Sequence, residues 1–92
     1  MNAPGATVAE RIRQKLAELH PDSLEVRDDS AAHAGHAGAR SGGGHYSIVI
    51  VSPDFAGQPP QRRHRMVYAA LGAMMQQEIH ALAIQAYAPD EI

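Results

Sequence analysis

Histidine is the residue type in this sequence best suited to chemistry, because it is abundant while cysteine is absent. The 92-residue chain has six histidines, and His33, His36 and His45 fall in one segment rich in alanine and glycine. A further histidine, His80, stands immediately before the uncharged run at 81–84. A neutral imidazole is a common metal ligand, so these four side chains are candidate ligands. Without cysteine, any metal on this chain must be held through histidine or carboxylate.

Each of these histidines also has a simpler interpretation. For His80 it is a structural histidine at the edge of a strand, and for the other three it is a solvated loop in which the imidazoles bind nothing. His33 and His36 together could chelate zinc or nickel, but such a site would be weak, because ordering a flexible loop costs roughly 1–2 kcal/mol per residue.

A second candidate site is the basic run Arg62, Arg63, His64 and Arg65, which opens a predicted helix. Cations are unfavourable at a helix N-terminus, so the run has a local cost. It predicts an anion site for nucleic-acid phosphate, a glutathione carboxylate or an acidic partner surface. The alternative is a solvated helix end in which His64 packs against the helix.

Composition restricts the class of protein. A chain of this length forms one small domain, and with one Phe and no Trp its core must be thin. The net charge of −2 gives no general attraction to nucleic acid, and no stretch is long and apolar enough to span a membrane. We therefore expect a soluble, cytoplasmic protein. No nucleophile–base arrangement is evident, so we also expect that the protein is not an enzyme.

Periodicity predicts the elements that position these residues. Thr7 and Glu10 form a capping box that starts a helix, and Pro21 follows its end. A short strand follows, in which Leu24 and Val26 alternate with charged residues, and the strongest strand begins at Tyr46. The predicted elements are a helix at about 8–20, a strand ending at 28–30, a mobile loop at 30–44, a strand at 46–52, a helix at about 61–77 and a strand at 81–87.

The order αββαβ predicts an α+β fold, in which a three-stranded sheet has both helices packed on one face. The two strands that flank the long loop are expected to pair as an antiparallel hairpin, with the last strand alongside. We expect the domain to cover 7–88, with residues 1–6 as a disordered lead and 89–92 as a tail. A Gly-x-x-Gly match at 35–38 lies between strands, whereas a KH-type RNA clamp needs it between helices, so we treat the match as coincidence.

Three segments, read in this order, carry a resemblance to a known family: Leu24-Glu-Val-Arg-Asp-Asp-Ser30, Gln61-Arg-Arg-His-Arg-Met-Val-Tyr68 and Ile79-His-Ala-Leu-Ala-Ile84. Over about 7–88 the chain resembles the BolA family. The resemblance implies a fold similar to class II KH domains, in agreement with the predicted element order. It also implies heterodimers with monothiol glutaredoxins that share a [2Fe–2S] cluster and act in iron–sulfur trafficking and iron homeostasis.

The family pattern assigns roles to residues of this chain. His80 matches the cluster-ligating histidine, and the second ligand is a loop histidine, for which the resemblance favours His33, then His45, then His36. A glutaredoxin cysteine and glutathione would supply the thiolates. Some members are described as DNA-binding transcriptional regulators, so the alternative is a regulator that uses the basic run Arg62, Arg63, His64 and Arg65. We expect the free protein to be a monomer or a weak homodimer.

Overall fold

The computed structural model describes residues 7–29 and 44–92, and its element order is αββαβ, as predicted. The helices and strands are α1 (Val8–Leu16), β1 (Ser23–Asp28), β2 (Gly44–Val51), α2 (Pro60–Leu71) and β3 (Ile79–Tyr87). The expected lead at 1–6 and nearly all of the expected loop at 30–44 lie outside the described residues; Gly44 is the first residue of β2. Within the described part of the chain, no helix is both long and apolar enough to cross a bilayer.

α1 begins at the predicted capping box. The Glu10 amide donates to the Thr7 hydroxyl at 3.1 Å, and the Thr7 amide donates to the Glu10 carboxylate at 2.8 Å. These bonds satisfy amides that have no partner inside the helix. Ile12 and Leu16 are fully buried on the inner face, and a 3-10 turn at Ala17–Leu19 ends the element.

α2 is shorter than the sequence analysis predicted. The apolar stripe suggested a helix to residue 77, but the helix ends at Leu71, because Gly72 has a φ of 56°. Glycine reaches positive φ without the steric cost that a Cβ imposes, so it is a natural helix terminator. The chain continues as a 3-10 turn at Gly72–Gln76, where Met74 is buried.

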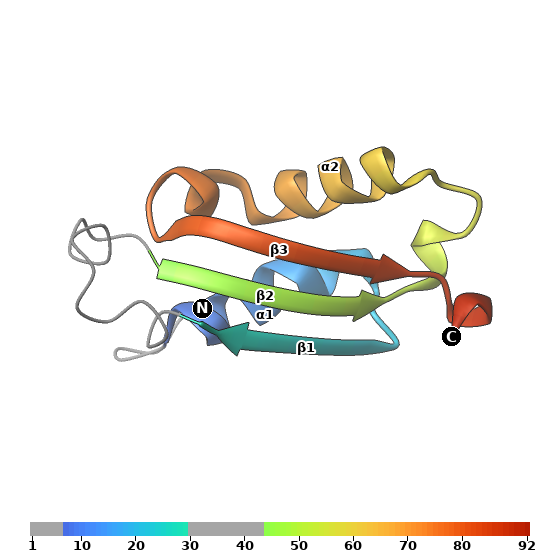
Figure 1. The fold of residues 1–92 in the computed structure, drawn as a ribbon, viewed down its shortest axis with the longest axis horizontal. Coiled ribbons are helices and arrows are strands. Elements are labelled where there is room, and N and C mark those ends of the chain that lie inside the picture. Colours follow the sequence, from blue (N-terminus) through green and yellow to red (C-terminus); the bar gives the residue numbers. More distant parts are fainter. Residues whose placement is uncertain (1–6, 30–43) are drawn as a thin grey trace.

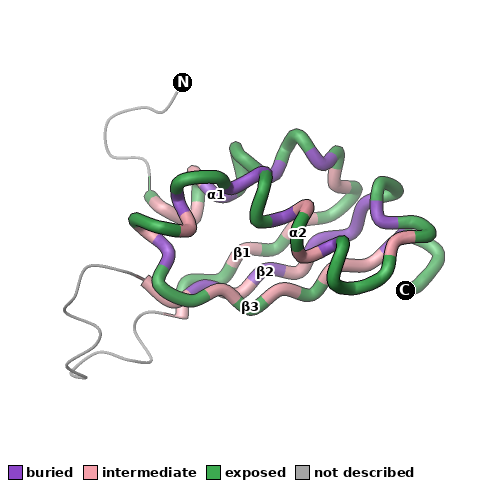
Figure 2. Tube along the Cα trace, turned by 90° about the horizontal axis from the view of Figure 1, so that it is seen from above, coloured by how far each residue is buried: buried purple, intermediate pink, exposed green. Residues whose placement is uncertain are grey.

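The sheet has the order β1-β2-β3, as Figure 1 shows, with β1 antiparallel and β3 parallel to β2. This confirms the predicted hairpin and the return of the last strand. Both helices lie on one face of the sheet (Figure 2), and Ile48 and Ile50 point into the core beneath them. No helix of the described residues covers the opposite face, which is called the open face below. Side chains alternate between the two faces along each strand.

Candidate metal centre

The structure brings His45 and His80 together at the start of two neighbouring parallel strands. Their ring centroids are 5.3 Å apart, and the ring planes are inclined by 35°. His80 is exposed and His45 is half-buried. Two imidazoles that hold one metal ion through nitrogens about 2.1 Å away in tetrahedral geometry have ring centres roughly 5 Å apart. The spacing of the two rings therefore matches that of two imidazoles on one metal atom.

A β-bulge orients His80. In the register of β2 and β3, Gly44 pairs with Ile79 and His45 pairs with Ala81, so His80 is the extra residue. Ile79 is buried in the core, and Leu82 packs against the core, whereas His80 and Ala81 between them are both exposed. Without the extra residue, His80 would share the face of Leu82 and enter the core. Bulges commonly re-aim a side chain in this way beside functional sites.

The sequence analysis ranked His45 second, after His33, as the companion of His80; the bulge beside them was not predicted, although a signal for it is present. The core-facing residues of β3 are Ile79, Leu82 and Ile84, spaced by three and then by two positions. Strict alternation requires a spacing of two throughout, so the first interval indicates one inserted residue. The register that pairs His45 with Ala81, and so places the bulged His80 beside His45, is a long-range property that this spacing does not contain.

The beginning of β3 is tied to two other elements. The Glu78 carbonyl accepts a hydrogen bond from the Gly44 amide at 2.9 Å, which joins β3 to the start of β2. The Glu78 carboxylate forms an ion pair with Arg11 of α1, and both side chains are largely covered. Two further atoms of this pair, Arg11 Nε and Glu78 Oε1, are buried without a hydrogen-bond partner among the described residues. Residue 78 thus fixes the backbone two positions before His80.

His45 is held from the β1 side by Asp29. The Asp29 amide donates to the His45 carbonyl at 2.8 Å. The Asp29 carboxylate accepts hydrogen bonds from Ser47 Oγ and, at 3.1 Å, from Arg27 Nε. These contacts are the last hydrogen bonds between the β1 side and β2, just after β1 ends. They position the backbone of His45, and with it one member of the histidine pair.

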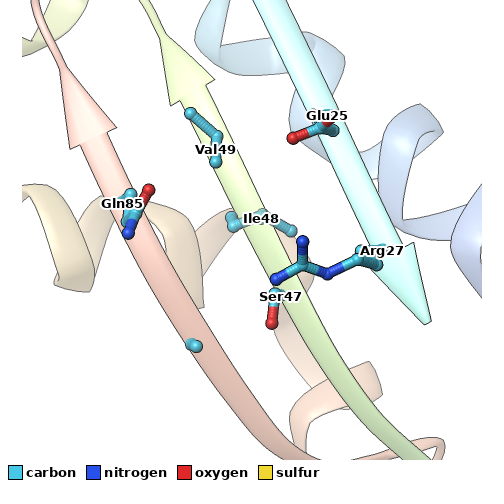
Figure 3. Close-up of a pocket in the computed structure, with 7 residues that line it drawn as sticks. Glu25, Arg27, Ser47, Ile48, Val49 and Gln85 are labelled. Carbon is cyan, nitrogen blue, oxygen red and sulfur yellow. The ribbon is translucent and has the colours of Figure 1, made fainter. Parts of the chain in front are cut away.

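Two adjoining hollows extend from His45 along the open face. One contains His45 and Asp29, the other contains Arg27, and both are lined by Ser47 and Ala83. Figure 3 shows the second hollow, with the Arg27 guanidinium reaching across the sheet toward Ser47. Small residues on the sheet surface keep this region open beside His45.

The other expected ligands, His33 and His36, lie outside the described residues. Within residues 7–29 and 44–92, no group of three or more His, Asp or Glu side chains is placed to hold a metal ion. His45 and His80 are thus a two-ligand set. A metal centre built on them needs further ligands from elsewhere.

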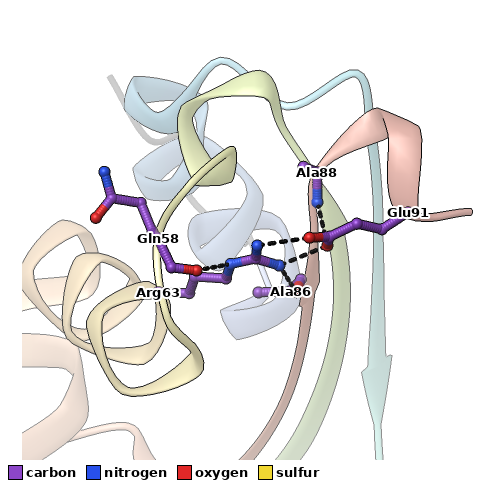
Figure 4. Close-up of polar contacts among 5 residues, drawn as sticks. All are labelled: Gln58, Arg63, Ala86, Ala88 and Glu91. Atoms are coloured by element: carbon purple, nitrogen blue, oxygen red, sulfur yellow. Dashed lines mark hydrogen bonds and ion pairs between the residues drawn. The ribbon is translucent and has the colours of Figure 1, made fainter.

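The structure separates the members of the basic run. Arg62 and Arg65 are exposed. His64 is only half-buried, so it is not the fully buried packing residue of the alternative interpretation. Arg63 is instead the buried member, and its side chain is 10% exposed. Its guanidinium donates to the carbonyls of Gln58 and Ala86 and makes two hydrogen bonds to the Glu91 carboxylate, at 2.6 and 2.7 Å (Figure 4).

Arg63 therefore has a structural role, joining the start of α2, the end of β3 and the last residues of the chain. The segment expected as a tail at 89–92 contains a 3-10 turn, Pro89–Glu91, whose glutamate is the partner of Arg63. The four basic residues are alike in sequence, and no local pattern pairs position 63 with position 91. Arg62, His64 and Arg65 remain the accessible part of the predicted anion site.

The Arg63–Glu91 pair predicts a loss of stability in acid. The pKa of Glu91 is lowered to about 2, mainly because Arg63 donates hydrogen bonds to the carboxylate and also because the Ala88 amide does so. The stabilisation by a lowered pKa is complete above the unfolded value, about 4.5, and is lost as the pH falls through about 2. This loss of stability is measured by thermal unfolding of wild type and Glu91→Gln between about pH 6 and about pH 2, the range over which carboxylates titrate.

The expected result is that the difference in Tm between wild type and Glu91→Gln is largest near neutral pH and shrinks as the pH falls from about 4.5 toward 2. Asp90→Asn is the matched control, since Asp90 is an exposed neighbour without this contact. A Tm difference for Glu91→Gln that is constant over the whole range would contradict the role of the carboxylate.

Comparison with known proteins agrees with this architecture. The family model for BolA-like protein matches residues 16–91. The chain is 44% identical over 79 residues to human BolA-like protein 1, covering 85% of this chain and 56% of that protein. It is 41% identical over 81 residues to the DNA-binding transcriptional regulator BolA of Escherichia coli, covering 87% and 74% respectively.

A third relative is SufE-like protein 1, chloroplastic/mitochondrial, of Arabidopsis thaliana, with 43% identity over 88 residues, 89% of this chain and 24% of that protein. The solved BolA domain of SufE1 from Arabidopsis thaliana superposes with a TM-score of 0.80 at 40% identity, covering 95% of this chain and 98% of that domain. The chain spans about a quarter of the plant protein and little more than half of the human one. The match over the fold and the matched family model show that this chain belongs to the BolA-like protein family.

Proposed function

We propose that this protein is a non-enzymatic adaptor that shares a [2Fe–2S] cluster with a monothiol glutaredoxin and acts in iron–sulfur trafficking and iron homeostasis. The observation that carries the proposal is the pair His45 and His80, whose rings lie 5.3 Å apart at the exposed end of the sheet. Family membership supports the choice of partner, because the BolA pattern implies a glutaredoxin.

The donor set of this chain fits one half of such a cluster. The chain has no cysteine, and the histidine pair offers two neutral nitrogen ligands. The remaining ligands must be thiolates, which a glutaredoxin cysteine and glutathione would supply. When bound, a [2Fe–2S] cluster offers one-electron chemistry and transferable iron and sulfur, and replacing two thiolates by two imidazoles raises its reduction potential. His45 and His80 would hold one iron atom and present it toward the partner.

The observed geometry favours His45 over the other loop histidines as the companion of His80. Asp29 and the sheet register hold the His45 backbone in place before any metal binds. A preorganised ligand loses less conformational entropy on binding than one that must first be ordered. His33 and His36 stay predictions of the sequence analysis, since both lie outside the described residues.

The experiment is a reconstitution of the cluster in a mixture of the two proteins. The full chain is combined with a monothiol glutaredoxin, glutathione, ferrous iron and sulfide, and the heterodimer is isolated by size-exclusion chromatography. The proposal expects visible absorption and circular dichroism in the heterodimer fraction that differ from those of the glutaredoxin alone. A mixture that yields no heterodimer and no new cluster signal would contradict it.

A second candidate function is DNA binding, which is favoured by the name of the Escherichia coli relative, a DNA-binding transcriptional regulator. Arg62 and Arg65 are exposed at the start of α2, where they can reach phosphates. Arg63 is already bonded to Glu91, which leaves fewer free cations in the run. The net charge of −2 also weighs against strong binding. We therefore rank this function second.

DNA binding through the basic run predicts a defined salt dependence. If Arg62 and Arg65 each neutralise one phosphate, the double variant Arg62→Gln, Arg65→Gln makes the negative slope of log K against log salt shallower by roughly 2, at about 0.9 per contact. Fluorescence anisotropy with a labelled duplex at several salt concentrations measures this. Arg13→Gln on α1 serves as the control, since Arg13 lies outside the run. The absence of binding at low salt would remove this function.

The cytoplasmic location expected from the sequence stays a prediction. The plant SufE-like relative is named chloroplastic/mitochondrial, so family membership does not specify a compartment. The relatives are named as BolA-like proteins or as a regulator, which supports a role other than catalysis.

A further inference from the structure

The two edges of the sheet differ in how they are protected. β1 at one edge carries Glu25, Arg27 and Asp28 among its six residues, and the carbonyl of Leu24 accepts a hydrogen bond from Arg13 at 3.1 Å. β3 at the other edge has nine residues and no charged side chain. Proteins usually protect edge strands with charges, because an unprotected edge is a template for pairing with another strand. The unprotected edge is the one that carries His80.

The backbone groups that this edge presents can be identified from two hydrogen bonds. Tyr87 faces β2, because its carbonyl accepts from the Ser52 amide at 2.9 Å. Ala86 faces outward, because its carbonyl accepts from Arg63 of α2 at 3.0 Å. In a strand of a parallel pair, the amide and carbonyl of one residue point to the same side of the strand, and those of the next residue point to the other side. Leu82 and Ile84 therefore direct theirs outward, as Ala86 does.

These outward groups have no partner from the rest of the described chain. Among residues 7–29 and 44–92, no hydrogen bond joins the backbone of Leu82 or Ile84 to α2, to a turn or to a side chain. Their side chains are only half-buried where they pack against the core. The protected part of the edge is thus confined to Ala86, where Arg63 binds. The open part begins two residues after His80.

We infer that an extended segment of the partner adds as a fourth strand along β3, pairing with the backbone of Leu82 and Ile84; this rests on the proposed function. A partner that completes a metal centre must bring its sulfur atoms to His80. Leu82 is about 7 Å along the strand from His80, at about 3.3 Å per residue. A strand anchored there extends directly to the histidine pair. A second copy of this chain is a poorer occupant, because it has no cysteine and brings no thiolate.

Amide hydrogen exchange of the full chain tests this surface. We expect the Leu82 and Ile84 amides to exchange rapidly in the free protein and at least roughly tenfold more slowly with excess cluster-loaded monothiol glutaredoxin and glutathione. The Val26 amide is the internal control: it shares the outward direction of Leu24 on the β1 edge and should not change. Unchanged exchange at Leu82 and Ile84 in the saturated heterodimer would overturn the inference.

The same sample separates this inference from the proposed function, because the cluster signal is recorded alongside exchange. A heterodimer-specific cluster signal with unchanged Leu82 and Ile84 amides overturns only strand addition. Slower exchange at both amides without a cluster signal supports strand addition and counts against the shared cluster. If exchange at Leu82 and Ile84 slows in the chain alone as its concentration rises, two copies of the chain pair along β3. That result overturns the choice of the glutaredoxin partner as the added strand.

A pair of lysine substitutions gives a second test. Ala83→Lys places a charge at an exposed position on the β3 edge, and Ser23→Lys places the same charge at an exposed position on the β1 edge. We expect Ala83→Lys to weaken glutaredoxin binding by about tenfold, because lysine discourages strand addition, while Ser23→Lys leaves binding within about twofold of wild type. Equal affinities for the two variants would count against the inference.

Discussion

Replacing His80 with alanine is expected to remove the cluster from the heterodimer with a monothiol glutaredoxin. In the proposed centre His80 is one of two imidazoles that hold the same iron atom, and its ring lies 5.3 Å from that of His45. Changing a residue that only orients a metal ligand already costs about 10–100-fold in metal affinity, so loss of the ligand itself should cost more than about 100-fold. The measurement is visible absorption and circular dichroism of the isolated heterodimer.

His45→Ala should have a comparable effect, because in the proposed centre the two histidines hold the same iron atom. His20→Ala is the control: His20 is an exposed histidine at the end of the turn after α1, where its ring contacts Asp54 at 3.0 Å. Wild-type cluster content in His20→Ala together with losses in the other two variants is the predicted pattern. Wild-type content in His80→Ala would contradict the assignment of the metal centre.

The second large effect is on folding and concerns Phe55, whose side chain is completely buried. It lies in the 3-10 turn Pro53–Phe55 between β2 and α2, and the Arg63 guanidinium lies 6.0 Å from its ring centroid. Phe55→Ala is expected to lower the free energy of unfolding by about 3–5 kcal/mol, because a buried phenyl leaves a cavity. Since small domains have a total of about 5–15 kcal/mol, the variant should be barely stable.

Thermal and urea unfolding followed by circular dichroism measure this effect. Tyr68→Ala is the matched control: it also truncates an aromatic ring, but Tyr68 is 42% exposed on α2. A surface substitution of this kind should change the free energy of unfolding by only about 0.5 kcal/mol. A Phe55→Ala variant as stable as Tyr68→Ala would show that the turn contributes little to the core.

The order and pairing of the elements could be predicted from the sequence because they depend on local patterns. Thr7 and Glu10 specify the start of α1, and the β-branched run of β2 identifies the central strand. The end of α2 was predicted too late, because the apolar stripe through Met74 outweighed the signal of Gly72. A positive φ at one glycine ends a helix whatever pattern follows it.

The candidate site could be predicted only in part. His80 was identified through its family pattern, whereas its contact with His45 depends on a bulge and on the pairing of β2 with β3. The separate role of Arg63 depends on Glu91, which is 28 residues away in the chain. Such contacts follow from tertiary packing and leave little trace in local spacing. The strand edge of β3 likewise becomes visible only when the order of the strands is known.

Pulsed electron paramagnetic resonance on the reduced heterodimer tests the central claim most directly. The full chain is labelled uniformly with ¹⁵N and combined with an unlabelled monothiol glutaredoxin, glutathione and the cluster. We predict strong couplings from two directly bound ¹⁵N nuclei in the wild-type heterodimer, and loss of the cluster signal in both His80→Ala and His45→Ala. A reduced cluster without strong ¹⁵N coupling, or with both couplings intact in His45→Ala, would contradict the claim that His45 and His80 hold one iron atom.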